Sequence, residues 1–119
     1  MKQSKLIVQT KNGKYPIIIG RNLSKIFKGN LIHFNKCFLL IDNKIKIKIV
    51  KEFTNSIKQK KIIYKFNSSE KNKNINSVIK ILDLLQKNNF NRNDCLITIG
   101  GGITGDTGGF AASLYKRGL

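Results

Sequence analysis

Seven of the ten glycines in this 119-residue chain fall between positions 100 and 118. They follow directly after Cys95–Ile99, a largely apolar run that is typical of a buried strand. Residues 100–105 read Gly-Gly-Gly-Ile-Thr-Gly and satisfy the pattern G-x-G-x-x-G, and a helix is expected from about Gly105 to Lys116. A strand, a glycine turn and a helix in this order are typical of ligand-binding α/β domains.

The chain is expected to open with a β-hairpin. Residues 5–9 form an apolar strand, Asn12-Gly13 is a turn signal, and residues 15–20 return as the second strand. Pro16 is expected at the start of this second strand, where a missing N–H group is tolerated.

Between the hairpin and the glycines, the pattern predicts strands that alternate with helices. The expected elements are a short helix through Phe27 capped by Asn22 or Ser24, strands at 38–41 and 61–66, and an amphipathic helix at 75–85. Residues 44–56 fit both a strand, through alternating Ile45, Ile47 and Ile49, and a helix. We favour the helix because two successive parallel strands need a crossover connection.

This order predicts an α/β fold: a Rossmann-like, open and mostly parallel sheet with helices on both faces, opened by the β-hairpin. The length fits one such domain, residues 1–119.

The longest apolar run, 37–41, is far below the roughly 20 residues of a membrane-spanning helix, and the stretch 6–8 is too short for a signal peptide. Cys37 and Cys95 match no metal-ligand or redox spacing. We therefore expect a cytoplasmic protein with no membrane partner.

The formal net charge of +17 raises the question of a nucleic-acid partner. The basic residues are 20 lysines and 3 arginines, scattered along the chain with no block of five like charges. Arginine, which reads base edges through two parallel hydrogen bonds, is scarce. We attribute the charge to a composition bias toward Lys, Asn and Ile, and we expect no specific nucleic-acid partner.

The glycine turn has the chemistry of an anion site. Glycines permit a positive φ and let backbone N–H groups approach an anion closely. The helix that follows adds the positive end of its dipole and its unpaired N–H groups, which suit a phosphate or pyrophosphate. The alternative is that the glycines serve only the close packing of the strand against the helix.

Two features depart from the standard dinucleotide-binding fingerprint. The glycine turn follows the last strand instead of the first, and only 14 residues follow Gly105, so the usual acid about 20 residues further on has no counterpart. Ribose-binding groups would therefore come from Asp42 and Asn43 after one strand, or from Glu70 after the next. Asp106 could bind a sugar hydroxyl or a carboxamide of a cofactor, or could simply complement the helix dipole.

Residues 96–118 closely resemble the cofactor loop and following helix of 3-dehydroquinate synthases, whose pattern is GGGxxGDxxGFxAAxxxRG. This pattern is far more specific than the glycine motif inside it. Residues 15–19 are similar to that family's opening hairpin, and Glu70 and Lys73 fall where the family carries a D-G-E-x-Y-K type motif. The resemblance extends over the whole chain.

The resemblance implies a set of site residues. Those matching the family's NAD-binding positions are Asn43, Glu70, Lys73, Gly101, Gly102, Ile103, Thr104, Gly105 and Asp106. Arg117 matches a position that contacts the phosphate of the sugar-phosphate substrate, whereas a solvated arginine at a helix end is an equally simple interpretation. The chain departs from the family at Ser68, Ser69 and Asn72, which stand where the family has Asp, Gly and Tyr.

By the same resemblance, the complete enzyme is a carbon–oxygen lyase of the shikimate pathway. It converts 3-deoxy-D-arabino-heptulosonate 7-phosphate to 3-dehydroquinate and phosphate with NAD and a divalent metal, zinc or cobalt. The family's metal ligands, one Glu and two His, belong to a carboxyl-terminal helical domain, and the single histidine here, His33, lies upstream of every motif. We therefore expect an incomplete amino-terminal NAD-binding domain, a fragment that is inactive alone and a homodimer when complete.

Two other functions stay open. Related metal- and NAD-dependent sugar-phosphate cyclases and polyol dehydrogenases share the triple-glycine loop. Gly105-Asp106, followed by residues 109–112, favours the synthase over the dehydrogenases and separates it less well from the cyclases. The other alternative is a small basic nucleic-acid-binding module, whose affinity would fall steeply with salt.

Overall fold

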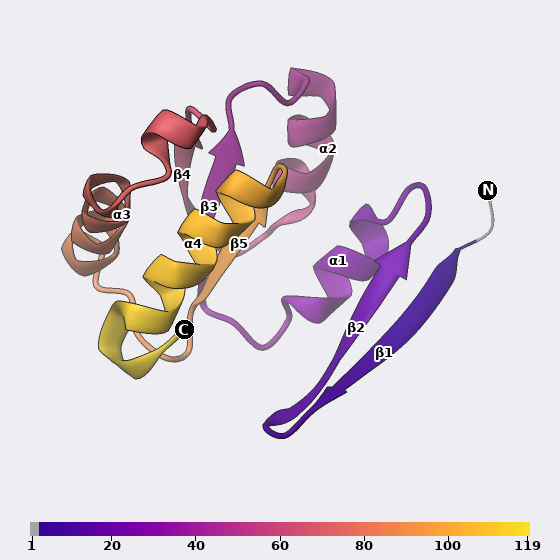
Figure 1. The fold of residues 1–119 in the computed structure, drawn as a ribbon. Helices are drawn as coiled ribbons and strands as arrows, with labels where there is room; N and C mark the ends of the chain where they lie inside the picture. The colour runs from indigo at the N-terminus through magenta and orange to yellow at the C-terminus, as the bar shows by residue number, and fades with distance from the viewer. Residues whose placement is uncertain (1–2) are drawn as a thin grey trace.

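The structure is a computed structural model that describes residues 3–119 (Figure 1). The strands are β1 (Ser4–Thr10), β2 (Gly13–Ile19), β3 (Lys36–Asp42), β4 (Lys60–Phe66) and β5 (Cys95–Ile99). The α-helices are α1 (Ser24–Asn30), α2 (Ile47–Ser56), α3 (Ile75–Lys87) and α4 (Gly102–Leu114), and the 3-10 helices are η1 (Glu70–Asn72) and η2 (Tyr115–Arg117). Within residues 3–119, no helix combines the length and the apolar character needed to cross a bilayer.

The strands form two separate sheets. β1 and β2 pair antiparallel as a hairpin, and β3 pairs parallel with both β4 and β5 in the order β4-β3-β5. Phe38 of β3 lies opposite Ile62 of β4 and Leu96 of β5, so the three strands end at the same edge of the sheet. This arrangement confirms the predicted α/β fold with its parallel sheet and opening hairpin.

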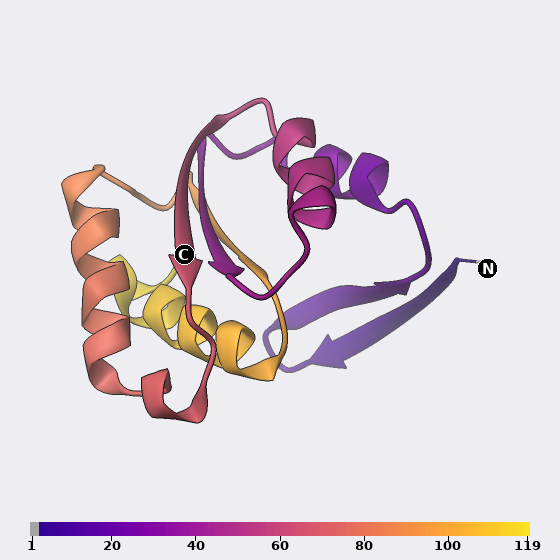
Figure 2. The same ribbon diagram turned by 90° about the horizontal axis from the view of Figure 1, so that it is seen from above.

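Helices cover both faces of the parallel sheet, as the sequence predicts (Figure 2). Cys37, Leu39 and Ile41 of β3 belong to the core cluster beneath α1 and α2. Phe38 and Leu40 belong to the cluster beneath α3 and α4. Both sets are fully buried, which explains why β3 is apolar at successive positions instead of alternating with polar residues.

Two expectations for the amino-terminal part are wrong in detail. Pro16 lies in the middle of β2, opposite Ile7, and is tolerated there because a two-stranded sheet leaves one edge of each strand unpaired. α1 extends beyond Phe27 to Asn30, and its N-cap is Leu23. Neither Asn22 nor Ser24 caps this helix through its side chain, because no side-chain hydrogen bond reaches its first turn.

Two further expectations fail around the glycine segment. α4 begins at Gly102 instead of Gly105, so the glycine turn is shorter than expected and Asp106 lies beyond the first helical turn. β5 is an edge strand among the described residues, and its side chains are mostly half-buried, with Thr98 exposed. The expectation of a strand buried on both sides therefore holds for β3 and not for β5.

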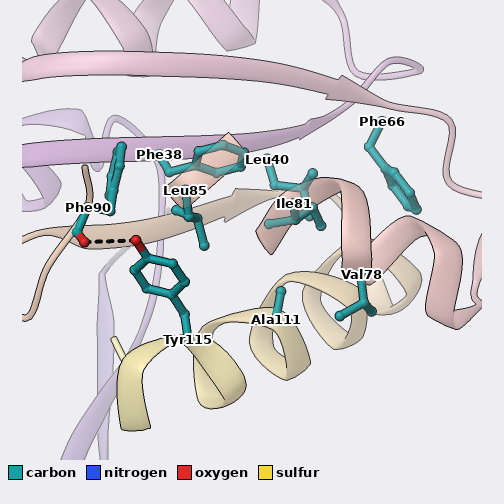
Figure 3. Packing of buried hydrophobic residues seen from close by; sticks show 9 residues of the cluster. All are labelled: Phe38, Leu40, Phe66, Val78, Ile81, Leu85, Phe90, Ala111 and Tyr115. Atoms are coloured by element: carbon teal, nitrogen blue, oxygen red, sulfur yellow. Dashed lines mark hydrogen bonds between the residues drawn. The ribbon is translucent and has the colours of Figure 1, made fainter. Parts of the chain in front are cut away.

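α3 and α4 pack on the sheet around a contiguous set of buried side chains (Figure 3). The set consists of Phe38, Leu40, Phe66, Val78, Ile81, Leu85, Phe90, Ala111 and Tyr115. The hydroxyl of Tyr115 donates a hydrogen bond of 2.9 Å to the carbonyl of Phe90 (Figure 3). This bond ties the end of α4 to the turn that leads from α3 to β5.

We expect Tyr115→Phe to destabilise the fold while leaving its packing intact. The substitution removes the donor and leaves the buried Phe90 carbonyl without its partner, which costs about 1 to 2 kcal/mol of the free energy of unfolding. Equilibrium urea unfolding of the full-length protein measures the loss. Tyr15→Phe, at a half-exposed tyrosine on the hairpin, is the matched control and should be neutral, so equal effects of the two substitutions would contradict the role of the Tyr115 bond.

Candidate functional site

The N-terminus of α4 lies at the carboxyl edge of the parallel sheet, where open α/β sheets bind their ligands. Its N-cap is Gly101, in an extended conformation, and no side chain caps the helix. The first bond within the helix runs from the Gly105 N–H group to the Gly101 carbonyl, at 3.0 Å. Helix geometry leaves the N–H groups of Gly102, Ile103 and Thr104 without intrahelical acceptors, so they are available to an anion.

Gly100 brings the glycine turn against the end of β3. Its φ is +156°, and a methyl group there would lie 2.8 Å from Thr104 Oγ1 and 2.9 Å from Asp42 Cβ. At Gly101 and Gly102, by contrast, a methyl group would meet no atom within 4 Å. Gly100 is therefore required by the protein's own packing, whereas the next two glycines face open space that a ligand can occupy.

Thr104 completes the underside of this turn. It is fully buried, and its Oγ1 has no hydrogen-bond partner among the described residues. A buried hydroxyl without a partner costs free energy, so its presence is typical of a site that acquires a partner when a ligand or an ordered water binds. The anionic part of a dinucleotide fits the donors of this helix N-terminus and the open space above them.

Lys73 and Asp106 form an ion pair that joins the loop after β4 to α4, with 3.1 Å between Lys73 Nζ and Asp106 Oδ2. Asp106, and to a smaller extent Glu70, raises the pKa of Lys73 above its ordinary value, so the ammonium group is fully charged at neutral pH. The pair borders a surface cavity of about 360 Å³. The cavity is lined by Lys73, Asn74, Ile75, Val78, Asp106, Thr107 and Phe110.

Asp42, the last residue of β3, is held in place by two donors. Its Oδ1 accepts a hydrogen bond of 2.9 Å from the Lys44 backbone N–H group. The hydroxyl of Ser68 and this N–H group lower the pKa of the Asp42 carboxyl below its ordinary value of 3.8. The carboxylate is therefore ionised at neutral pH. Asp42 Cβ lies against Gly100, so the residue packs beside the glycine turn.

The lowered pKa of Asp42 gives a signed prediction for stability. The ionised form stabilises the folded state, so its contribution is complete above pH 3.8 and is lost as the pH falls through the lower pKa of the folded protein. We expect the difference in unfolding free energy between wild type and Asp42→Asn to shrink as the pH is lowered below this value. Urea unfolding over a pH series measures it, and a difference that stays constant with pH would contradict the assignment.

The structure brings some of the predicted site residues together and separates others. The N-terminal turns of α4 contain residues 101–106. Lys73 and Glu70 lie beside them. Asn43 is exposed and lines a different cavity of about 290 Å³, between α2 and the ends of β3 and β4. Arg117 lies in η2, but its side chain is outside the described part of the structure. His33 is exposed.

Two contacts of the parallel sheet and its loops have no sequence signal. The thiols of Cys37 and Cys95 lie 3.5 Å apart, because the two residues are neighbours across β3 and β5, and both are free. Burial raises the pKa of each thiol, so both are protonated at neutral pH. The second contact, in which Lys44 Nζ donates to the Ser68 carbonyl at 3.0 Å, links the loops after β3 and β4.

Within residues 3–119, no cluster of three or more His, Cys, Asp or Glu side chains could hold a metal ion.

A glycine turn at the carboxyl edge of a parallel sheet, followed by an uncapped helix, defines the class: an open α/β domain of the Rossmann type. Residues 63–119 match the family described as 3-dehydroquinate synthase N-terminal. The chain is 52% identical over 120 residues to the 3-dehydroquinate synthase of Pelagibacter ubique (strain HTCC1062). That alignment covers 97% of this chain and 33% of the Pelagibacter protein. It is 37% identical over 115 residues to the enzyme of Dictyoglomus turgidum, with coverages of 96% and 32%. The chain therefore corresponds to the amino-terminal part of the 3-dehydroquinate synthase family and spans about a third of the length of these relatives.

Solved structures agree on the fold. A 2-deoxy-scyllo-inosose synthase in complex with carbaglucose-6-phosphate, NAD+ and Co2+ superposes with a TM-score of 0.84 at 19% identity, over 98% of this chain and 33% of that one. A 2-epi-5-epi-valiolone synthase from Streptomyces hygroscopicus subsp. jinggangensis, with NAD+ and Zn2+ bound, gives a TM-score of 0.63 at 20% identity, over 71% and 25%. At these identities the likeness concerns the fold alone.

Proposed function

We propose that this chain is the NAD-binding part of a 3-dehydroquinate synthase. The observation that carries the proposal is the uncapped N-terminus of α4 behind the glycine turn, next to the Lys73–Asp106 pair, in a chain 52% identical to a protein of that name. The substrate of the complete enzyme would be 3-deoxy-D-arabino-heptulosonate 7-phosphate, and the products 3-dehydroquinate and phosphate. This places the protein in the shikimate route to chorismate and the aromatic amino acids.

In this proposal the glycine turn binds the pyrophosphate. The backbone N–H groups at the start of α4 donate to its oxygens, and the open space at Gly101 and Gly102 admits them. Ile103, Thr104 and Gly105 form the first helical turn beneath the ligand. The buried Thr104 hydroxyl gains a partner there, directly or through an ordered water.

Asp106 would repel a pyrophosphate if its charge were not compensated. The ion pair with Lys73 offsets that charge, and both side chains remain partly exposed at the border of the cavity, where they can reach the ribose or carboxamide of the cofactor. Glu70 lies on the same side and contributes a further acceptor for ribose hydroxyls. Asn43, on the far side of the β3 end, would bind the adenosine ribose, and Arg117 the phosphate of the substrate.

The remaining chemistry needs groups outside these 119 residues. We propose that a carboxyl-terminal helical domain supplies the ligands of a divalent metal, zinc or cobalt, since residues 3–119 hold no suitable cluster and the relatives are about three times as long. NAD held at the glycine turn would supply reversible hydride transfer with a substrate hydroxyl, which would acidify the neighbouring C–H bond for phosphate elimination. The 119 residues alone would be inactive, and the complete enzyme a homodimeric lyase.

The test is phosphate release by the full-length protein. We expect release from the heptulosonate phosphate to require NAD and a divalent metal, to stop on chelation, and to be absent for residues 1–119 alone. A full-length protein that binds NAD but does not release phosphate would contradict the synthase assignment.

A second candidate is a related sugar-phosphate cyclase, because the fold superposes on 2-deoxy-scyllo-inosose synthase with a TM-score of 0.84. Such an enzyme would act on a hexose phosphate, so comparing the two substrates on the same preparation separates the candidates. A nucleic-acid-binding module, suggested by the charge of +17, predicts instead an affinity for RNA or DNA that falls steeply with salt and is unaffected by NAD.

A further inference from the structure

The loop at residues 67–73, which carries Glu70 and Lys73, is fixed to the rest of the domain near both of its ends. At the carboxyl end, Lys73 pairs with Asp106 of α4. At the amino end, Lys44 Nζ donates a hydrogen bond of 3.0 Å to the Ser68 carbonyl. The loop therefore spans from the end of β3 to the second turn of α4, past the glycine turn.

Lys44 is itself fixed where it enters this contact. Its backbone N–H group donates to Asp42 Oδ1 at 2.9 Å. Asp42 Cβ in turn lies against Gly100. Lys44 thus contributes a backbone donor at the end of β3 and a side-chain donor to the loop after β4.

Within the loop, the remaining hydrogen bonds are local. Asn72 donates through its side chain to the Asn67 carbonyl at 2.9 Å, and its backbone N–H group donates to Ser69. These bonds shape the loop but do not orient it relative to the sheet. Just before the loop, the Asn43 N–H group donates to the Phe66 carbonyl at 2.9 Å. Within the loop, whose Ser68 and Ser69 replace the Asp and Gly of the resembling motif, Lys44 Nζ supplies a side-chain donor at the amino end.

We propose that Lys44 is a positioning residue for the cofactor: it holds the 67–73 loop in the orientation in which Glu70 and Lys73 face the glycine turn. This inference rests on the proposed NAD-binding function. The hydrogen bond is charge-assisted, so it is stronger than a bond between neutral groups. Without it, the loop would sample orientations that do not bind, and the apparent affinity would fall by the fraction of time spent in them.

The experiment compares three variants of the full-length protein. Lys44→Met removes the donor but keeps the aliphatic stem, Lys44→Arg retains a donor, and Lys48→Met is the matched control, an exposed lysine on α2. We expect Lys44→Met to weaken NAD binding about tenfold in calorimetry and to speed tryptic cleavage after Lys71, with an unchanged melting temperature. Lys44→Arg and Lys48→Met should both behave as wild type.

The outcomes separate this inference from the function on which it rests. Wild-type protein that fails to bind NAD overturns the proposed function and the positioning role together. Wild type that binds NAD, with Lys44→Met of equal affinity, overturns the positioning role alone. Equal losses of NAD affinity in Lys44→Met and Lys44→Arg also overturn the positioning role, because arginine would restore a positioning donor. A lowered melting temperature that accounts for the loss of affinity overturns it as well.

Discussion

Gly101→Val is expected to weaken cofactor binding strongly while leaving the protein folded. Gly101 has an extended backbone, which valine readily adopts, and a side chain there meets no protein atom within 4 Å. The free energy of unfolding should therefore change by no more than about 0.5 kcal/mol. The new side chain occupies the space through which a pyrophosphate must approach the N–H groups of α4, so we expect the affinity for NAD to fall on the order of a hundredfold.

Gly109→Val is the matched control for this substitution. Gly109 lies on the same helix, is exposed, and offers the same open space to a new side chain. Calorimetric titration of both full-length variants with NAD should give wild-type affinity for Gly109→Val and almost no binding for Gly101→Val. Equal affinities would mean that the cofactor does not approach this turn.

Gly108→Ala is expected to destabilise the protein. A methyl group at Gly108 would overlap the methyl group of Thr98 and lie 3.1 Å from Leu40 Cδ2 and 3.2 Å from Leu96 Cδ2. α4 would have to move away from β3 and β5, at a cost of about 1 to 3 kcal/mol. The gain of about 0.5 to 1 kcal/mol that alanine offers over glycine inside a helix offsets only part of this cost, so we expect a net loss of stability.

The adjacent residue provides the control for this prediction. Gly109→Ala makes the same chemical change one position along α4, where nothing lies within 4 Å, and should stabilise the protein by about 0.5 to 1 kcal/mol. Urea unfolding of the two variants should therefore give effects of opposite sign. If Gly108→Ala were as stable as Gly109→Ala, the close packing of α4 on the sheet would be contradicted.

The order of strands and helices could be predicted because apolar periodicity is strong in this chain. The apolar run Phe38–Ile41 predicts a strand with two buried faces, and the spacing of apolar residues from Ile75 to Leu85 predicts a helix with one apolar face. The ambiguous segment 44–56 forms α2 from Ile47 to Ser56, because the parallel pairing of β3 with β4 requires a crossover.

The start of α4 could not be predicted from local signals. Glycine and threonine are poor helix formers, so the sequence favours a later start, near Gly105. Packing of Gly108 against Thr98 and Leu40 brings the helix onto the sheet earlier, and α4 begins at Gly102. Tertiary packing thus overrides local propensity at the residues that form the candidate anion site.

Contacts between residues far apart in the chain could not be predicted from the sequence either. The approach of Cys37 to Cys95, and the bond from Lys44 to Ser68, both depend on the register of β3 with its neighbours, which residue spacing does not reveal. The sequence offers Asp42 and Asn43 together as candidates for binding a ribose, and in the structure both line the cavity beside α2, while Asp42 Cβ also lies against Gly100. The resemblance to the family identifies the glycine segment, and the structure shows which residues lie next to it.

The most direct test of the central claim is a calorimetric titration of the full-length protein with NAD at about 50 and about 200 mM salt. The account predicts one saturable site per chain, with an affinity that changes little between the two salt concentrations and is lost in Gly101→Val. A folded protein with no saturable NAD binding, or one whose NAD site is unaffected by the Gly101 substitution, would contradict the claim that the glycine turn before α4 holds the cofactor.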